Sequence, residues 1–130
     1  MKEVFLGGTC NNSQWRESLI PLLTINYFNP VVPNWNEAAA ALELEKRETS
    51  DYVLYVITPK MTGVYSIAEV VDDSNKRPEK TIFCYLTFDG EQKFSAAQIK
   101  SLEQTGKMIK KNGAQFFKTF AEVSDYLNNH

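Results

Sequence analysis

The chain has 130 residues, of which 43% are hydrophobic and 23% charged, a composition typical of one globular domain, here residues 1–130. Its net charge of −2 excludes a basic surface for polymeric nucleic acid, although a single nucleoside or nucleotide needs only a local pocket. No apolar stretch approaches the roughly 20 residues that cross a bilayer, and the N-terminus lacks a signal-peptide pattern. We therefore expect a cytoplasmic protein without a membrane partner.

The cysteines and the histidine argue against metal or cofactor chemistry. Cys10 and Cys84 are too few for a disulfide scaffold, and their spacing is no metal signature. The single histidine, His130, is the last residue of the chain. We expect no metal, no cofactor and no Ser-His catalytic pair, and Cys10 has no evident base that would make it a nucleophile.

The first part of the chain predicts a strand followed by a helix. The apolar residues 4–6 form a short strand that ends at the Gly-Gly-Thr sequence of residues 7–9, where glycine permits a tight turn. Apolar residues at helical spacing then predict a helix over residues 13–23, with its N-cap supplied by Asn11, Asn12 or Ser13. Pro21 predicts a kink or an early end of this helix.

The middle of the chain predicts two strands that flank a helix. Residues 27–32 form the second strand, in which Pro30 marks an edge position or a bulge. Asn36 can cap a helix over residues 37–49, which is rich in strong helix formers. The nearly continuous apolar run 52–57 predicts a central strand covered on both faces.

The remaining residues continue the alternation of helix and strand. Strands are expected at residues 81–86 and 114–117, and helices at residues 66–73, 95–111 and 119–127. A turn is expected at residues 88–90. This order predicts a three-layer α/β/α fold with a flavodoxin-like, five-stranded parallel sheet of strand order 2-1-3-4-5. Strands one and three then adjoin, so the loops at residues 7–9 and 60–63 share one crevice.

One carboxylate, Glu69, lies in the apolar helix that follows the third strand. Two interpretations of it remain open from the residues alone. Ser66 and Glu69 have the spacing of a capping box, in which the glutamate binds the end of its own helix, or the side chain is simply exposed. A residue at this edge of a parallel sheet is also well placed for chemistry.

These features resemble the nucleoside 2-deoxyribosyltransferase-like family. The resemblance covers roughly residues 4–86 and rests on the order and spacing of several short pieces: Phe5-Leu6-Gly7-Gly8-Thr9, Trp15-Arg16, Tyr27-Phe28-Asn29-Pro30, Asp51, and Gly63 to Glu69. It implies a flavodoxin-like fold with Glu69 as nucleophile. Attack on the anomeric carbon of a 2-deoxynucleoside would form a covalent glycosyl ester, and the nearby helix N-terminus would help to keep the carboxylate ionised.

The resemblance also implies a second acid and shows one departure. The family places an acid eight residues before the aspartate that opens the third strand, which here is Asp51 and leads to Glu43. Glu43 would protonate the departing base, or it is an ordinary charge on its helix. Transferases of the family carry an aspartate six residues before the nucleophile, where this chain has Gly63. This departure fits the related deoxynucleoside-monophosphate N-glycosidases better.

Several other residues are candidates for substrate binding. The loop residues Gly7, Gly8 and Thr9 would offer N–H groups and a hydroxyl, or form a plain turn. Arg16 would pair with a 5′-phosphate, or is a solvated helix residue. Trp35 would stack on a nucleobase, or belongs to the core. The crevice would also be lined by Met61, Gly63, Tyr65 and Ser66.

The first hypothesis is an enzyme that cleaves or transfers the N-glycosidic bond of a 2-deoxynucleoside or its 5′-monophosphate. The alternative is a module that binds a nucleotide or nucleotide-derived ligand without turnover, which the glycine at position 63 favours. A structural interaction domain with a vestigial pocket is a third possibility. The resemblance further implies a homo-oligomer, a dimer or larger.

Overall fold

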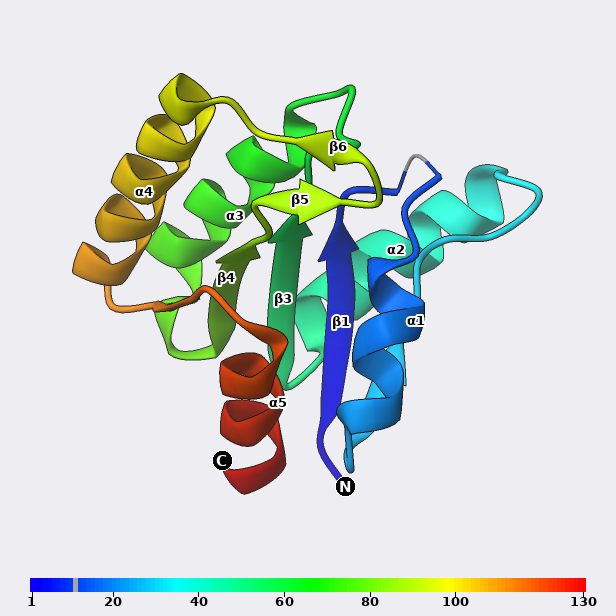
Figure 1. Ribbon diagram of the computed structural model, residues 1–130. Helices are drawn as coiled ribbons and strands as arrows, with labels where there is room; N and C mark the ends of the chain where they lie inside the picture. The colour runs from blue at the N-terminus through cyan, green and yellow to red at the C-terminus, as the bar shows by residue number, and fades with distance from the viewer. Residues whose placement is uncertain (11) are drawn as a thin grey trace.

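A parallel sheet forms the centre of the protein, as the computed structural model of residues 1–10 and 12–130 shows (Figure 1). Its five strands run in the order β2-β1-β3-β4-β7, which confirms the predicted flavodoxin-like order. The strands are β1 Glu3–Gly8, β2 Asn26–Phe28, β3 Tyr52–Ile57, β4 Thr81–Tyr85 and β7 Gln115–Phe117. Neighbouring β1 and β3 have crossovers on opposite sides, so a crevice opens beyond their carboxyl ends.

Strand β3 is central because all six of its residues are apolar and buried. It pairs with β1 through Leu6 opposite Leu54, and with β4 through Leu54 opposite Ile82. Burial on both faces explains the continuous apolar run, since neither face of such a strand meets water. The chain therefore leaves β3 at the edge of the crevice described above.

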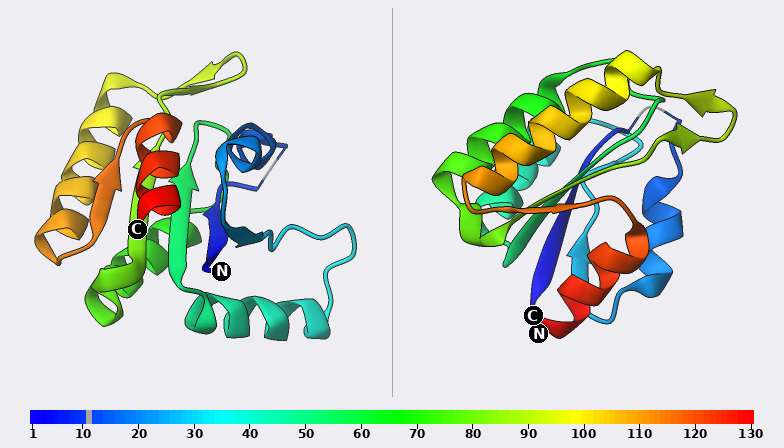
Figure 2. Two further views of the ribbon diagram at one scale, coloured as in Figure 1. Left: turned by 90° about the horizontal axis from the view of Figure 1, so that it is seen from below. Right: turned by 60° about the vertical axis from the view of Figure 1, so that its left-hand side comes forward.

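Helices cover both faces of the sheet (Figure 2). On one face lie α1 (Trp15–Leu19) and α5 (Phe120–Asn129), which bury Leu19 and Val123 against the sheet. On the other lie α3 (Tyr65–Lys76) and α4 (Ala96–Lys111), which bury Val70 and Ile109. Helix α2 (Glu37–Thr49) lies beside α3 and contacts it through Arg47. No helix in the described part of the chain has the length and apolar character needed to cross a membrane.

The helix expected over residues 13–23 is shorter than predicted. Helix α1 ends at Leu19, and Pro21 lies in a single 3-10 turn over Ile20–Leu22, as its ring and missing N–H require. The N-cap position is Gln14, which makes no side-chain capping bond, so neither Asn12 nor Ser13 occupies the cap, although the Oγ of Ser13 accepts the N–H of Trp15 at 3.4 Å. Asn11 lies outside the described residues.

The remaining boundaries agree closely with prediction, with three differences. Strand β2 ends at Phe28, so Pro30 lies in the loop beyond it. The expected turn at residues 88–90 is part of a small antiparallel hairpin, β5 (Phe88–Asp89) and β6 (Gln92–Lys93). Helix α3 begins at Tyr65 and extends to Lys76. Asn36 caps α2 as predicted, because its side chain accepts the N–H of Ala39 at 2.8 Å.

Candidate active site

Two adjoining cavities open at the carboxyl ends of β1 and β3. The carboxylate cavity, of about 290 Å³, is lined by Phe5, Gly7, Gly8, Cys10, Arg16, Pro30, Val31, Val32, Trp35, Glu43, Ser66 and Glu69. The loop cavity, of about 270 Å³, is lined by Gly8, Thr9, Cys10, Ile57, Met61, Thr62, Gly63, Tyr65 and Ser66. They share Gly8, Cys10 and Ser66. The structure thus brings every predicted site residue to one edge of the sheet.

Gly7 and Gly8, which were predicted to lie in a loop, are instead the last two residues of β1, and they pack too tightly against β3 to carry side chains. Gly8 has φ +118°, and a Cβ placed there would lie 2.0 Å from the carbonyl oxygen of Val56. Thr9 donates its N–H to the same oxygen at 2.9 Å, and its Oγ1 accepts the N–H of Thr58 at 3.0 Å. The groups of Thr9 that were expected to contact a ligand therefore already make hydrogen bonds to β3 and to the residue that follows it.

Glu69 lies in the second turn of α3 and faces the carboxylate cavity with its side chain 14% exposed. Its Oε2 lies 3.5 Å from Nη1 of Arg47. The capping box is not formed, because Ser66 is inside the helix and the N-cap, Val64, makes no side-chain capping bond. Glu69 is therefore neither a cap nor an ordinary surface residue.

Burial raises the pKa of Glu69 above its ordinary value, and the charges of Glu43 and Asp73 act in the same direction while Arg47 opposes them. Burial likewise raises the pKa of Glu43, against the effect of Arg16 and Arg47. Two carboxylates that share a cavity and repel one another favour a state in which one is ionised and one protonated. Such a pair can supply a nucleophile and an acid.

Arg16 is buried, which corrects the alternative of a solvated helix residue. Its Nε donates to the carbonyl of Leu6 at 3.0 Å, its Nη1 donates to that of Thr9 at 2.9 Å, and its guanidinium lies over the Trp15 ring. Burial lowers the pKa of Arg16 to about 10. Arg16 therefore supports the main chain on both sides of Gly7 and Gly8. A phosphate that bound to Arg16 would contact a guanidinium that already donates to two carbonyl groups.

The outer rim of the site is apolar and exposed. Trp35 is 60% exposed beside Val31 and Val32, so the alternative that places it in the core was wrong. Tyr65 is 72% exposed at the start of α3, at the edge of the loop cavity. A flat ring could stack on Trp35 without displacing other side chains.

Sequence reasoning missed the residues behind Glu69. Arg47, Asp73 and Tyr55 form a buried network in which Asp73 accepts from both other side chains. One signal was available, since Glu43 and Arg47 are four residues apart on α2 and so face the same way. Asp51, by contrast, accepts the N–H of Glu3 at the far end of β3, away from the site.

The strand order, with its switch point between β1 and β3, defines an α/β protein of the flavodoxin-like class, in which this edge of the sheet is the usual place for a ligand. A family model described as "Nucleoside 2-deoxyribosyltransferase like" matches residues 1–88, and the chain belongs to this family. The matched region contains every candidate site residue. No curated protein and no solved structure matches the chain at a significant level.

Proposed function

We propose that the protein cleaves or transfers the N-glycosidic bond of a 2-deoxynucleoside or its 5′-monophosphate, with Glu69 as nucleophile. One observation carries the proposal: Glu69 and Glu43, from different helices, line the same cavity, and burial raises the pKa of each. The apolar wall formed by Val31, Val32 and Trp35 suits a nucleobase. The loop cavity beside it is lined by Thr62, Tyr65 and Ser66, whose hydroxyl groups suit the sugar and its substituents.

The reaction proceeds in two displacements. The Glu69 carboxylate attacks C1′ as the C1′–N bond breaks, and Glu43 delivers its proton to the departing base. Water or a second base then attacks C1′, the ester C–O bond breaks, and Glu69 returns as a carboxylate. The proton of the incoming nucleophile passes to Glu43, which restores the starting state. Two inversions at C1′ give net retention.

These roles predict a bell-shaped pH dependence of kcat/KM. Activity rises with pH as Glu69 ionises and falls at higher pH as Glu43 loses the proton it must donate. A Glu43→Gln variant should lose about 10²-fold in activity, and the alkaline limb should disappear while the acid limb remains. The measurement is kcat/KM against pH for both proteins. An unchanged alkaline limb in the variant would remove Glu43 from the mechanism.

Gly63 bears on whether the reaction is hydrolysis or transfer to a second base. It lines the loop cavity, and a Cβ placed there would meet nothing within 4 Å, so a side chain is absent where there is room for one. Transferases that resemble this chain carry an aspartate at that position. The open space favours hydrolysis by water over transfer to a second base, and it is also the observation that favours a binding module without turnover.

The test is an incubation of the purified protein with the four deoxynucleosides and their 5′-monophosphates, with and without an acceptor base. Base release indicates a hydrolase, and base exchange indicates a transferase. A thermal shift without either product indicates the binding module. If no base is released or exchanged and no ligand shifts the unfolding temperature, the proposed function is wrong.

We propose in addition that the protein works in the cytoplasm as a homo-oligomer. In support, helix α2 turns apolar residues outward, with Leu42 at 42% and Leu44 at 62% exposure, and Trp35 before the helix is exposed as well. Cys84 is a free, buried thiol, which suits a reducing compartment. Light scattering after size exclusion should give the mass of a dimer or larger assembly. A monomer at micromolar concentration would contradict this.

A further inference from the structure

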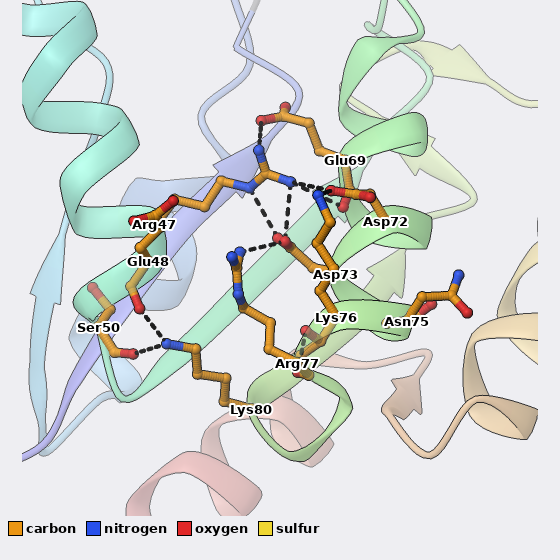
Figure 3. A network of polar contacts seen from close by, with 12 residues as sticks. Arg47, Glu48, Ser50, Glu69, Asp72, Asp73, Asn75, Lys76, Arg77 and Lys80 are labelled. Carbon is orange, nitrogen blue, oxygen red and sulfur yellow. Dashed lines mark hydrogen bonds and ion pairs between the residues drawn. The ribbon is translucent and has the colours of Figure 1, made fainter.

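Arg47 lies among three carboxylates of helix α3, those of Glu69, Asp72 and Asp73 (Figure 3). Its Nε and Nη2 each donate to one oxygen of Asp73 at 3.0 Å, which is the paired geometry that arginine prefers with a carboxylate. Its third nitrogen, Nη1, lies 3.5 Å from Oε2 of Glu69. The same guanidinium is therefore held firmly on one side and offers its charge to Glu69 on the other.

Asp73 is the anchor of this arrangement because it is fully buried and saturated with donors. Besides Arg47, it accepts the hydroxyl of Tyr55 at 2.6 Å and Nη1 of Arg77 at 2.6 Å. Tyr55 belongs to the central strand β3, so Asp73 is tied to the most rigid part of the fold. Asp73 and Glu69 are four residues apart on α3, and so face α2 together.

Helix α2 reaches this network with a charged inner face. Its half-buried residues include Glu43, Lys46 and Arg47, whereas no residue of α2 is fully buried. Arg47 therefore holds this helix on the body through its ion pair with the fully buried Asp73, whereas the pair of Lys46 with Glu3, at 3.1 Å, is partly exposed and contributes little to the seating of the helix. Glu43 lies one turn before Arg47, so its place in the cavity depends on the same contact.

We propose that Arg47 is a positioning residue for the reaction, which fixes Glu69 directly and Glu43 through the seating of helix α2. This inference rests on the proposed function. The ion pair between Arg47 and Oε2 of Glu69 leaves the other carboxylate oxygen of Glu69 to attack C1′ of the substrate. Arg47 also opposes the rise in the pKa of Glu69 that burial, Glu43 and Asp73 cause, so more of the nucleophile is ionised. The distance to Glu69 is longer than that to Asp73, so this carboxylate stays reactive.

The test compares Arg47→Gln and Arg47→Lys with Lys46→Gln, a neighbouring cation of α2 that lies outside both cavities. We expect Arg47→Gln to lose about 10²-fold in kcat with a smaller change in KM, and its acid limb to move to higher pH. Arg47→Lys keeps the charge without the paired geometry, so its acid limb should stay in place while kcat falls. Lys46→Gln should leave both kcat and the position of the acid limb unchanged.

A second readout does not depend on turnover. Carbon-13 NMR of labelled glutamate carboxylates, assigned with a Glu69→Gln variant, gives the pKa of Glu69 in the folded protein. We expect this pKa to rise in Arg47→Gln and to hold in Arg47→Lys and Lys46→Gln. An unchanged pKa in Arg47→Gln overturns the inference. If the wild type turns over no nucleoside, the proposed function fails, yet this titration still decides the role of Arg47. If Arg47→Gln does not fold, Arg47→Lys decides the role of Arg47. Where the wild type turns over substrate, full kcat in Arg47→Lys overturns the inference. Where it does not, an unchanged chemical shift of the Glu69 carboxylate carbon in Arg47→Lys overturns it, because the paired contact would then have no effect on Glu69.

Discussion

A Glu69→Gln variant is expected to lose turnover by about 10³-fold or more while its fold remains intact. The amide has the size and polarity of the carboxylate but cannot form the glycosyl ester, so no covalent intermediate can accumulate. The loss should appear in kcat with little change in substrate binding. Single-turnover measurements test the loss in kcat, and mass spectrometry of the quenched enzyme tests whether the covalent intermediate accumulates. Full activity in the folded variant would eliminate this mechanism.

The same variant should be no less stable than the wild type. The pKa of Glu69 is raised in the folded protein, so its protonated form is favoured there, and stability is lost as pH rises through that pKa. At neutral pH the ionised side chain is a cost to folding that the neutral glutamine avoids. We therefore expect an equal or higher Tm for Glu69→Gln at pH 7. Glu45→Gln, an exposed glutamate of α2, is the control and should change neither Tm nor activity.

The sequence predicted the fold well because its strands and helices carry strong local signals. The buried run of β3 and the capping residue Asn36 were placed correctly since each pattern has one physical cause. The short elements were harder to place. The hairpin of β5 and β6 has two residues in each strand and no apolar alternation, and the N-cap residue of α1, Gln14, makes no side-chain capping bond.

The candidate site was predictable only where topology fixes it. Loops after β1 and β3 must meet in a flavodoxin-like sheet, so Glu69 and the glycines could be placed from strand order alone. The burial and the contacts of each side chain could not be predicted in this way. Sequence gave no sign that Arg16 is buried under the loop or that Trp35 is exposed, because both depend on contacts between residues far apart in the chain. The role of Asp73 depends on Tyr55, Arg47 and Arg77 at once.

The largest expected effect on stability is that of Gly8→Ala. The backbone of Gly8 has φ +118°, a conformation that side chains with a Cβ rarely adopt, and the added carbon would lie 2.0 Å from the Val56 carbonyl oxygen. Either β1 must move away from β3, or the N–H of Thr9 must leave the oxygen it now binds. We expect the free energy of unfolding to fall by about 4 kcal/mol or more, a large part of the stability of a domain of this size.

Gly63→Ala is the matched control, because both glycines line the loop cavity but only Gly8 is constrained. A Cβ at Gly63 would meet nothing within 4 Å, so its substitution should change the free energy of unfolding by less than about 0.5 kcal/mol. Urea denaturation followed by circular dichroism measures both variants. Equal midpoints for Gly8→Ala and the wild type would mean that β1 and β3 do not approach as described. The crevice in which Glu69 and Glu43 lie beside Gly8 would then lose its structural basis, because the close approach of β1 and β3 at Gly8 also shapes that crevice.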